Sequence, residues 1–232
     1  MNDYPNTFGR GGSVTTAETR NRVLRNTYWL LALSMVPTVL GAWVGVATGF
    51  SLFAATSPAM SMLAFFAIAF GFMFAIQKTK DSSVGVFVLL GFTFFMGLML
   101  SRLLTFVLGF GNGAQLIGLA FGGTAIVFTA MASLASTIKR DLSSMGKFLF
   151  VGVIMLIVAA FANIFLHVPG LMIAISVIAI GIFSAFMLYD INRIVTGGET
   201  NYVTATLAIY LDVYNVFTNL LALLGITGGS SD

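Results

Sequence analysis

Seven long apolar stretches, separated by short polar segments, constrain the fold of this chain more than any other feature. A helix that spans a bilayer needs about 20 mostly apolar residues. Stretches of about this length cover residues 28–46, 59–76, 84–101, 115–136, 148–166, 171–189 and 203–226. Pro or Gly lies in several of the separating segments, as at Pro58, Pro169 and 109–113, where such residues end helices. The sequence therefore predicts an all-α membrane protein with seven transmembrane helices.

Composition supports a bilayer as the solvent. Charged residues make up 8% of the chain, whereas soluble domains average about 25%. Hydrophobic residues make up 58%, and the mean hydropathy is +1.00. These values exclude a soluble domain, a disordered chain and a coiled coil, and a net charge of +3 is too small for a nucleic-acid binder. The absence of cysteine excludes disulfides, thiolate metal sites and a cysteine nucleophile.

The basic residues predict the orientation in the membrane. Ten of the 11 Lys and Arg residues fall on the amino-terminal side of the predicted spans, and only Arg102 falls on the other side. Basic loops stay in the cytoplasm, so we expect a cytoplasmic amino terminus and an external carboxyl terminus. The ten residues are Arg10, Arg20, Arg22, Arg25, Lys78, Lys80, Lys139, Arg140, Lys147 and Arg193.

The polar ends of the chain are too short for further domains. Residues 1–26 are predicted to form a flexible basic cytoplasmic tail. Within it, Thr15 and Glu18 have the spacing of a capping box, which would start a short basic helix leading into the first span. Residues 27–226 form the seven-helix transmembrane domain, and residues 227–232 form a short external carboxyl terminus. A bacterial inner membrane is the predicted location.

Two aspartates lie at membrane depth, where ionisable groups are costly and often functional. Asp190 lies near the end of the sixth stretch, and Asp212 lies about 14 Å along the seventh helix from residue 203. Spacings of three and four place Asp212 on one helical face with Thr204, Asn215 and Asn219. Such a face avoids lipid, so we expect the seventh helix to lie at the centre of the other six.

Two neighbouring carboxyl groups in a low-dielectric site would share a proton, which predicts a pH sensor. Deprotonated, Asp190 and Asp212 would offer oxygens to a hard cation such as Ca²⁺. Tyr189, Arg193, Asn215 and Asn219 are the supporting polar residues. The alternative is structural: Asp190 forms an ion pair with Arg193, and Asp212 hydrogen-bonds to Asn or Tyr neighbours.

Glycine repeats and the single histidine are interpreted as structural. Gly41, Gly45 and Gly49 in the first stretch, and Gly118 and Gly122 in the fourth, have the spacing that allows close helix contact. His167 has no partner for a histidine-based metal site.

An enzyme is not expected. Intramembrane aspartyl proteases also place two aspartates on neighbouring helices, and Tyr189-Asp190 is similar to one half of their motif. The other half should read Gly-x-Gly-Asp, whereas the residues that end at Asp212 read Ile-Tyr-Leu-Asp. No cofactor is predicted.

Several motifs along nearly the whole chain resemble the Bax inhibitor-1 family. The most specific are Gly-Gly-Glu-Thr-Asn-Tyr at 197–202 and Tyr-Leu-Asp-Val-Tyr-Asn-Val-Phe at 210–217. Shorter ones are Leu-Arg-Asn-Thr-Tyr at 24–28, Gly-Gly-Thr-Ala at 122–125 and Lys-Arg-Asp-Leu-Ser at 139–143. Ala-Asn-Ile-Phe-Leu at 162–166 resembles the bacterial YccA-like branch of that family.

The resemblance implies a seven-helix fold with the last helix central, and one of two roles. By this resemblance, the YccA-like branch modulates FtsH, a membrane-anchored ATP-dependent protease. Its members bind the protease, and their cytoplasmic amino-terminal tail helps decide whether they are themselves degraded. Other members are pH-sensitive calcium leak channels, whose two sensor aspartates match Asp190 and Asp212. The resemblance therefore implies an FtsH-type protease or Ca²⁺ as a partner, besides the lipid bilayer.

Overall fold

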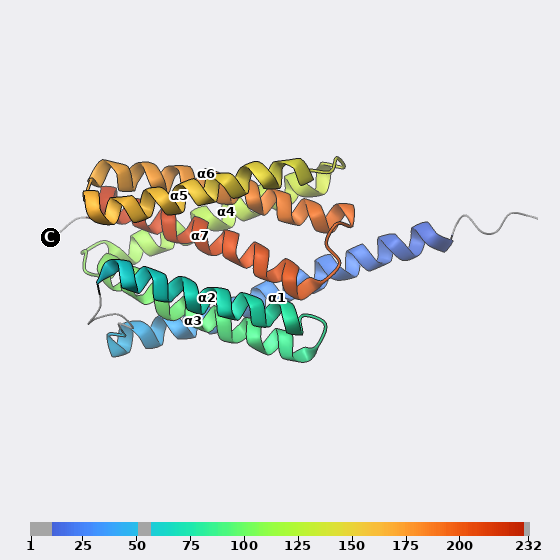
Figure 1. The fold of residues 1–232 in the computed structure, drawn as a ribbon, viewed down its shortest axis with the longest axis horizontal. Coiled ribbons are helices and arrows are strands. Elements are labelled where there is room, and N and C mark those ends of the chain that lie inside the picture. The colour runs from blue at the N-terminus through green and yellow to red at the C-terminus, as the bar shows by residue number, and fades with distance from the viewer. Residues whose placement is uncertain (1–10, 51–56, 230–232) are drawn as a thin grey trace, which may run out of the picture.

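The computed structural model describes residues 11–50 and 57–229, and these residues form seven helices and no strand (Figure 1). All seven helices are long and apolar enough to cross a membrane. Each predicted stretch lies inside one helix, so the prediction of an all-α protein with seven candidate spans is confirmed. The helices are α1 (Gly11–Thr48), α2 (Pro58–Thr79), α3 (Ser83–Leu108), α4 (Gly113–Thr137), α5 (Ser143–Leu166), α6 (Pro169–Thr196) and α7 (Tyr202–Gly228).

Helix α1 begins earlier than the sequence suggests. The structure continues it without a break through residues 11–26, within the range that the sequence assigns to the tail. Thr15 and Glu18 lie inside the helix rather than at its start, and residues 1–10 lie outside the described part of the chain. The amino-terminal part of α1 projects beyond the ends of the other helices (Figure 1).

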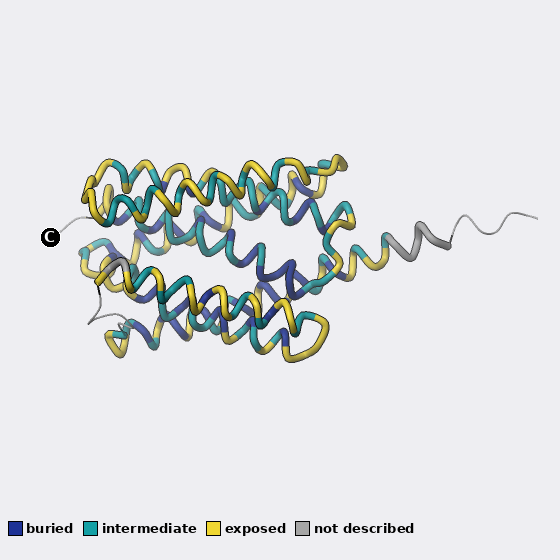
Figure 2. The backbone as a smooth tube through the Cα atoms, in the orientation of Figure 1, coloured by how far each residue is buried: buried dark blue, intermediate teal, exposed yellow. Residues whose placement is uncertain are grey.

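Helix α7 runs between two groups of helices, α1–α3 on one side and α4–α6 on the other (Figure 1). It contacts α1, α2, α3, α4 and α6, and packs most extensively on α6. The expectation that all six other helices surround it is wrong for α5, which packs on α6 and α2 instead. Helix α5 has no buried residue, and its outer side is exposed along its length (Figure 2).

Hydrogen bonds tie α7 to α1 and α3 on the side away from α6. The Tyr210 hydroxyl lies 2.9 Å from the Thr38 hydroxyl of α1. The Tyr214 hydroxyl donates to the Met96 carbonyl of α3 at 3.1 Å. Because lipid offers no alternative partners to such groups, these bonds keep this side of α7 inside the protein.

Glycines allow α1 and α3 to pack backbone against backbone. A Cβ atom on Gly97 would collide with the Thr38 carbonyl oxygen, and one on Gly41 would collide with the Phe94 carbonyl oxygen. A Cβ atom on Gly45 would strike the Ser101 side chain. The packing role is therefore confirmed for Gly41 and Gly45. It is wrong for Gly49, Gly118 and Gly122, where a Cβ atom would meet nothing within 4 Å.

We predict that Gly97→Val destabilises the protein by about 3 kcal/mol, because the two backbones must separate to admit the side chain. Thermal unfolding of the purified protein in detergent measures the loss. Gly118→Val is the matched control and should change the unfolding midpoint little. Equal losses in the two variants would contradict the close α1–α3 contact.

Candidate functional site

The two predicted aspartates face each other where α6 and α7 pack together. Asp212 is 4% exposed, and the Asp190 side chain is 12% exposed. The two carboxyl groups lie close enough to interact directly. No N–H or O–H group of the described residues donates to Oδ2 of Asp212. Because a hydrogen bond between two carboxyl groups requires a proton on one of them, this geometry accommodates one shared proton.

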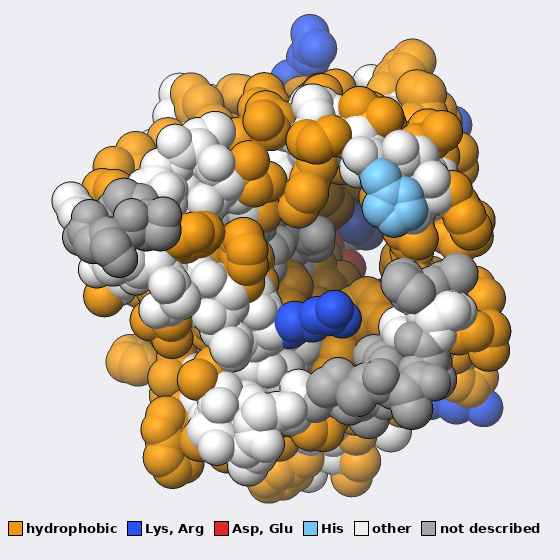
Figure 3. All heavy atoms as spheres, turned by 90° about the vertical axis from the view of Figure 1, so that its left-hand side faces the viewer, with side chains coloured by type: hydrophobic (Ala, Val, Ile, Leu, Met, Phe, Trp, Pro, Cys, Tyr) orange, Lys and Arg blue, Asp and Glu red, His pale blue; other side chains and the backbone are white. Residues whose placement is uncertain are grey.

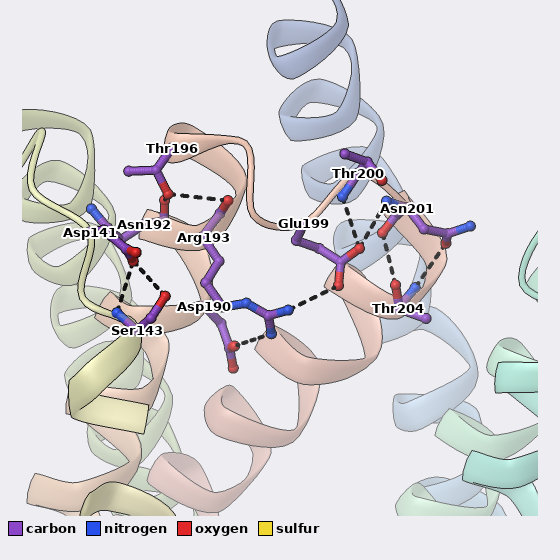
Figure 4. Close-up of polar contacts among 10 residues, drawn as sticks. All are labelled: Asp141, Ser143, Asp190, Asn192, Arg193, Thr196, Glu199, Thr200, Asn201 and Thr204. Carbon is purple, nitrogen blue, oxygen red and sulfur yellow. Dashed lines mark hydrogen bonds and ion pairs between the residues drawn. The ribbon is translucent and has the colours of Figure 1, made fainter. Parts of the chain in front are cut away.

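Arg193 lies between Asp190 and a second carboxylate, Glu199, at the turn from α6 to α7 (Figure 4). Its Nη1 atom lies 3.7 Å from Oδ1 of Asp190, and its Nη2 atom lies 3.7 Å from Oε2 of Glu199. The guanidinium also lies over the Tyr189 ring, 5.7 Å from its centre. Arg193 is one-third exposed, and ion pairs of this kind contribute about 1 kcal/mol or less. The ion pair therefore supplies local charge balance rather than much stability.

The other supporting residues do not hydrogen-bond to the aspartates. The side-chain amide of Asn215 donates to the Leu211 carbonyl, and that of Asn219 donates to the Asn215 carbonyl. Both bonds lie within α7. In the described residues, Asp190 therefore has both its predicted ion pair with Arg193 and the contact with Asp212, while Asp212 has no bond to an Asn or Tyr side chain.

The turn between α6 and α7 is held by two residues that sequence reasoning treated only as part of a family motif. Glu199 accepts hydrogen bonds from the backbone N–H groups of Thr200 and Asn201, each at 2.9 Å (Figure 4). Asn201 caps α7 by accepting from the N–H groups of Val203 and Thr204. Its amide donates to Lys80 and Asp81 in the loop between α2 and α3. Asn201 thus joins two loops.

A second anchor that the sequence did not reveal fixes the loop between α4 and α5. Asn192 of α6 is fully buried, and its amide donates to the Ile138 carbonyl at 2.9 Å. Farther along this loop, the hydroxyl and the backbone N–H of Ser143 donate to Asp141 (Figure 4). These two bonds hold the pKa of the exposed Asp141 carboxyl below its usual range.

The site does not offer the ligand set of a resident metal ion. The described residues contain no group of three or more His, Asp or Glu side chains that could hold a metal. Ca²⁺ takes about six to eight oxygen ligands, whereas this pair supplies two carboxyl groups. His167 ends α5 and lies beside the Phe165 carbonyl. The pair suits a proton or a passing cation better than a permanent metal.

The opposite end of the bundle is hollowed. Figure 3 shows an opening in the middle of that face, with a basic side chain across it and acidic atoms visible deeper inside.

We predict that Asn201→Ala lowers the unfolding free energy by about 2 kcal/mol, because it removes a helix cap and the bonds to the neighbouring loop. Thermal unfolding in detergent is the measurement. Thr200→Ala is the control, since only the backbone of Thr200 bonds to Glu199. If Asn201→Ala unfolds like Thr200→Ala, the two loops are not joined in this way.

Comparisons with known proteins agree over almost the whole chain. The family model described as "Inhibitor of apoptosis-promoting Bax1" matches residues 20–229. An uncharacterised membrane protein of Vibrio cholerae is 39% identical over 219 residues, which are 94% of this chain and 96% of the relative. The "Modulator of FtsH protease YccA" of Escherichia coli K12 is 36% identical over 211 residues, 91% of this chain and 93% of the relative. An equally similar protein of another E. coli strain is named "Inner membrane protein YccA".

Proposed function

The chain belongs to the Bax inhibitor-1 family of multi-pass membrane proteins, and from this we propose that it modulates an FtsH-type protease in a bacterial inner membrane. The observation that carries the proposal is the 36% identity to the E. coli modulator across nearly the full length of both chains. The protein acts by binding the protease rather than by chemistry of its own.

The distribution of charge supports contact with a protease from the cytoplasmic side. Apart from Arg102, the basic residues lie near the start of α1, at or beside the turns from α2 to α3 and from α4 to α5, and at the end of α6. Successive helices alternate in direction, so these segments share one end of the bundle. By the positive-inside rule that end is cytoplasmic. The part of α1 that projects there offers the protease a segment to engage (Figure 1).

We predict that deleting residues 2–16, while keeping Arg20, Arg22 and Arg25 for insertion, lengthens the half-life of the protein. The protease would lose the segment that it pulls, whereas the seven spans remain. A chase experiment after translation is stopped measures the half-life. Cells that lack the protease are the control, and the two forms should decay equally there.

Modulation of the protease is tested separately, by measuring the degradation rate of another membrane protein that the protease degrades. Raising the level of the full-length chain should slow degradation of that substrate, and the chain should co-purify with the protease. Two results together would contradict the proposal. The shortened chain would have the same half-life as the full-length chain, and raising the level of the full-length chain would leave the turnover of the substrate unchanged.

The close approach of the two carboxyl groups supports a second candidate function, a pH-sensitive calcium leak gated by Asp190 and Asp212. With one proton between them, the two groups carry a single negative charge. Loss of that proton leaves two like charges at close range inside the protein, which repel strongly in a medium of low dielectric. Ca²⁺ would relieve this repulsion by binding the same oxygens, in competition with Arg193. Figure 3 shows a hollow at the opposite end of the bundle with acidic atoms visible inside it, which suits such a path.

For this candidate we predict that Ca²⁺ flux into liposomes rises with pH, because protons and Ca²⁺ compete for the same oxygens. Asp190→Asn and Asp212→Asn should each abolish the pH dependence, since one carboxyl group alone cannot form the pair. Asp141→Asn, an equal change at an exposed loop position, should leave it intact. Absence of flux at every pH would rule out the leak and leave the protease role standing.

A further inference from the structure

A basic cavity lies where the first part of α1 meets the ends of α4 and α6. Its volume is about 600 Å³, within the usual range for small-molecule sites. Neither Asp190 nor Asp212 lines it. The lining residues are Ala17, Arg20, Asn21 and Leu24 from α1, Ser136 and Lys139 at the end of α4, and Val195 and Thr196 at the end of α6.

The charge of this cavity is positive. Arg20 and Lys139 line it, and no acidic residue does. Both ion pairs among the described residues belong to Arg193, so no described carboxylate neutralises either cation. The carboxyl ends of α4 and α6 each contribute about half a negative charge. The two helix ends together therefore offset about one of the two positive charges. The cavity keeps a net charge of about +1, which attracts an anion.

Hydrogen bonds to α6 position the Arg20 side chain and the backbone next to Lys139. The Nη1 atom of Arg20 donates to the Val195 carbonyl at 3.1 Å, which draws the side chain across from α1 to α6. Lys139 directly follows Ile138, whose carbonyl is fixed by the buried amide of Asn192. The two basic residues therefore belong to segments far apart in the sequence that are both hydrogen-bonded to α6.

We propose that this cavity binds the phosphate group of an anion, and that its occupant is the headgroup of an anionic phospholipid. The cavity lies at the ends of α4 and α6 and beside α1, all three of which are long and apolar enough to span a membrane. Basic pockets between helices on the cytoplasmic side are typical headgroup sites. Leu24 and Val195 add an apolar wall for the glycerol and upper acyl chain. A bound headgroup would fasten the projecting part of α1 to α4 and α6, a role separate from both candidate functions.

The test uses the purified full-length protein in neutral detergent, titrated with phosphatidylglycerol and followed by native mass spectrometry and thermal unfolding. Lys139→Gln should weaken lipid binding about fivefold, the share expected of one basic residue near a membrane surface. Arg140→Gln is the matched control. It removes the same charge from the adjacent, exposed residue, which does not line the cavity, and should weaken binding less than twofold.

Arg20 is tested in the same way against Arg22, which lines a different pocket. Arg20→Gln should weaken binding at least as much as Lys139→Gln, and Arg22→Gln should not. Arg20→Lys keeps the charge and should retain most of the affinity, which separates loss of the site from loss of folding.

Two further arms identify the source of the phosphate. Phosphatidylcholine, which has no net charge, should neither bind tightly nor raise the unfolding midpoint. If millimolar inorganic phosphate displaces phosphatidylglycerol and stabilises the protein equally, the phosphate site stands but its occupant is a free anion. Equal weakening by Lys139→Gln and Arg140→Gln would overturn the proposal, because the attraction would then be spread over the whole basic end.

Discussion

Hydrocarbon cannot solvate a carboxyl group, and this single constraint on Asp212 determines how the helices are arranged. Transfer of a polar group from water to the bilayer core without a hydrogen-bond partner costs about 2–7 kcal/mol of free energy. Helix α7 therefore lies inside the protein, and its neighbours supply its partners. The carboxyl group of Asp190 meets Asp212 from α6, while α1 and α3 offer a hydroxyl and a carbonyl to Tyr210 and Tyr214 on the other side. The remaining helices occupy what is left of the periphery, and α5, which reaches no part of α7, buries no residue.

The ends of the helices complete this arrangement at one face of the bundle. Glu199 and Asn201 close the turn from α6 to α7, and Asn201 also fastens it to the loop between α2 and α3. Asn192 fastens α6 to the loop between α4 and α5, and Arg20 fastens α1 to α6. The carboxyl pair and the basic cavity thus share a scaffold, because α6 positions a group in each. A ligand in the cavity and a change in protonation of the pair would both act on the same helix.

The spans were predictable from the sequence because a run of about 20 apolar residues has few alternatives in a bilayer. The partnership of Asp190 and Asp212 was also a sequence prediction, based on the face of α7 that Asp212 shares with Thr204, and the structure brings the two carboxyl groups together. The full extent of the projecting start of α1 was not predicted, since its polar residues look like those of a loop. Nor were the bonds of Asn192 and Asn201, because they join segments distant in sequence whose approach follows from packing. Glycine spacing alone could not distinguish Gly41 from Gly118. A Cβ atom on Gly41 would collide with the backbone of α3, whereas one on Gly118 would contact nothing within 4 Å.

The most direct measurement of the central claim, that α7 is buried with Asp212 against Asp190, is cross-linking in native membranes. The chain has no cysteine, so engineered pairs report without background. Cysteines that replace Asp190 and Asp212 should be joined within one chain by a short bifunctional thiol reagent. A pair at Asp212 and Val158 of α5 should not be joined, because α5 does not contact α7. Failure of the first pair to react, or equal linking of the second, would contradict the account.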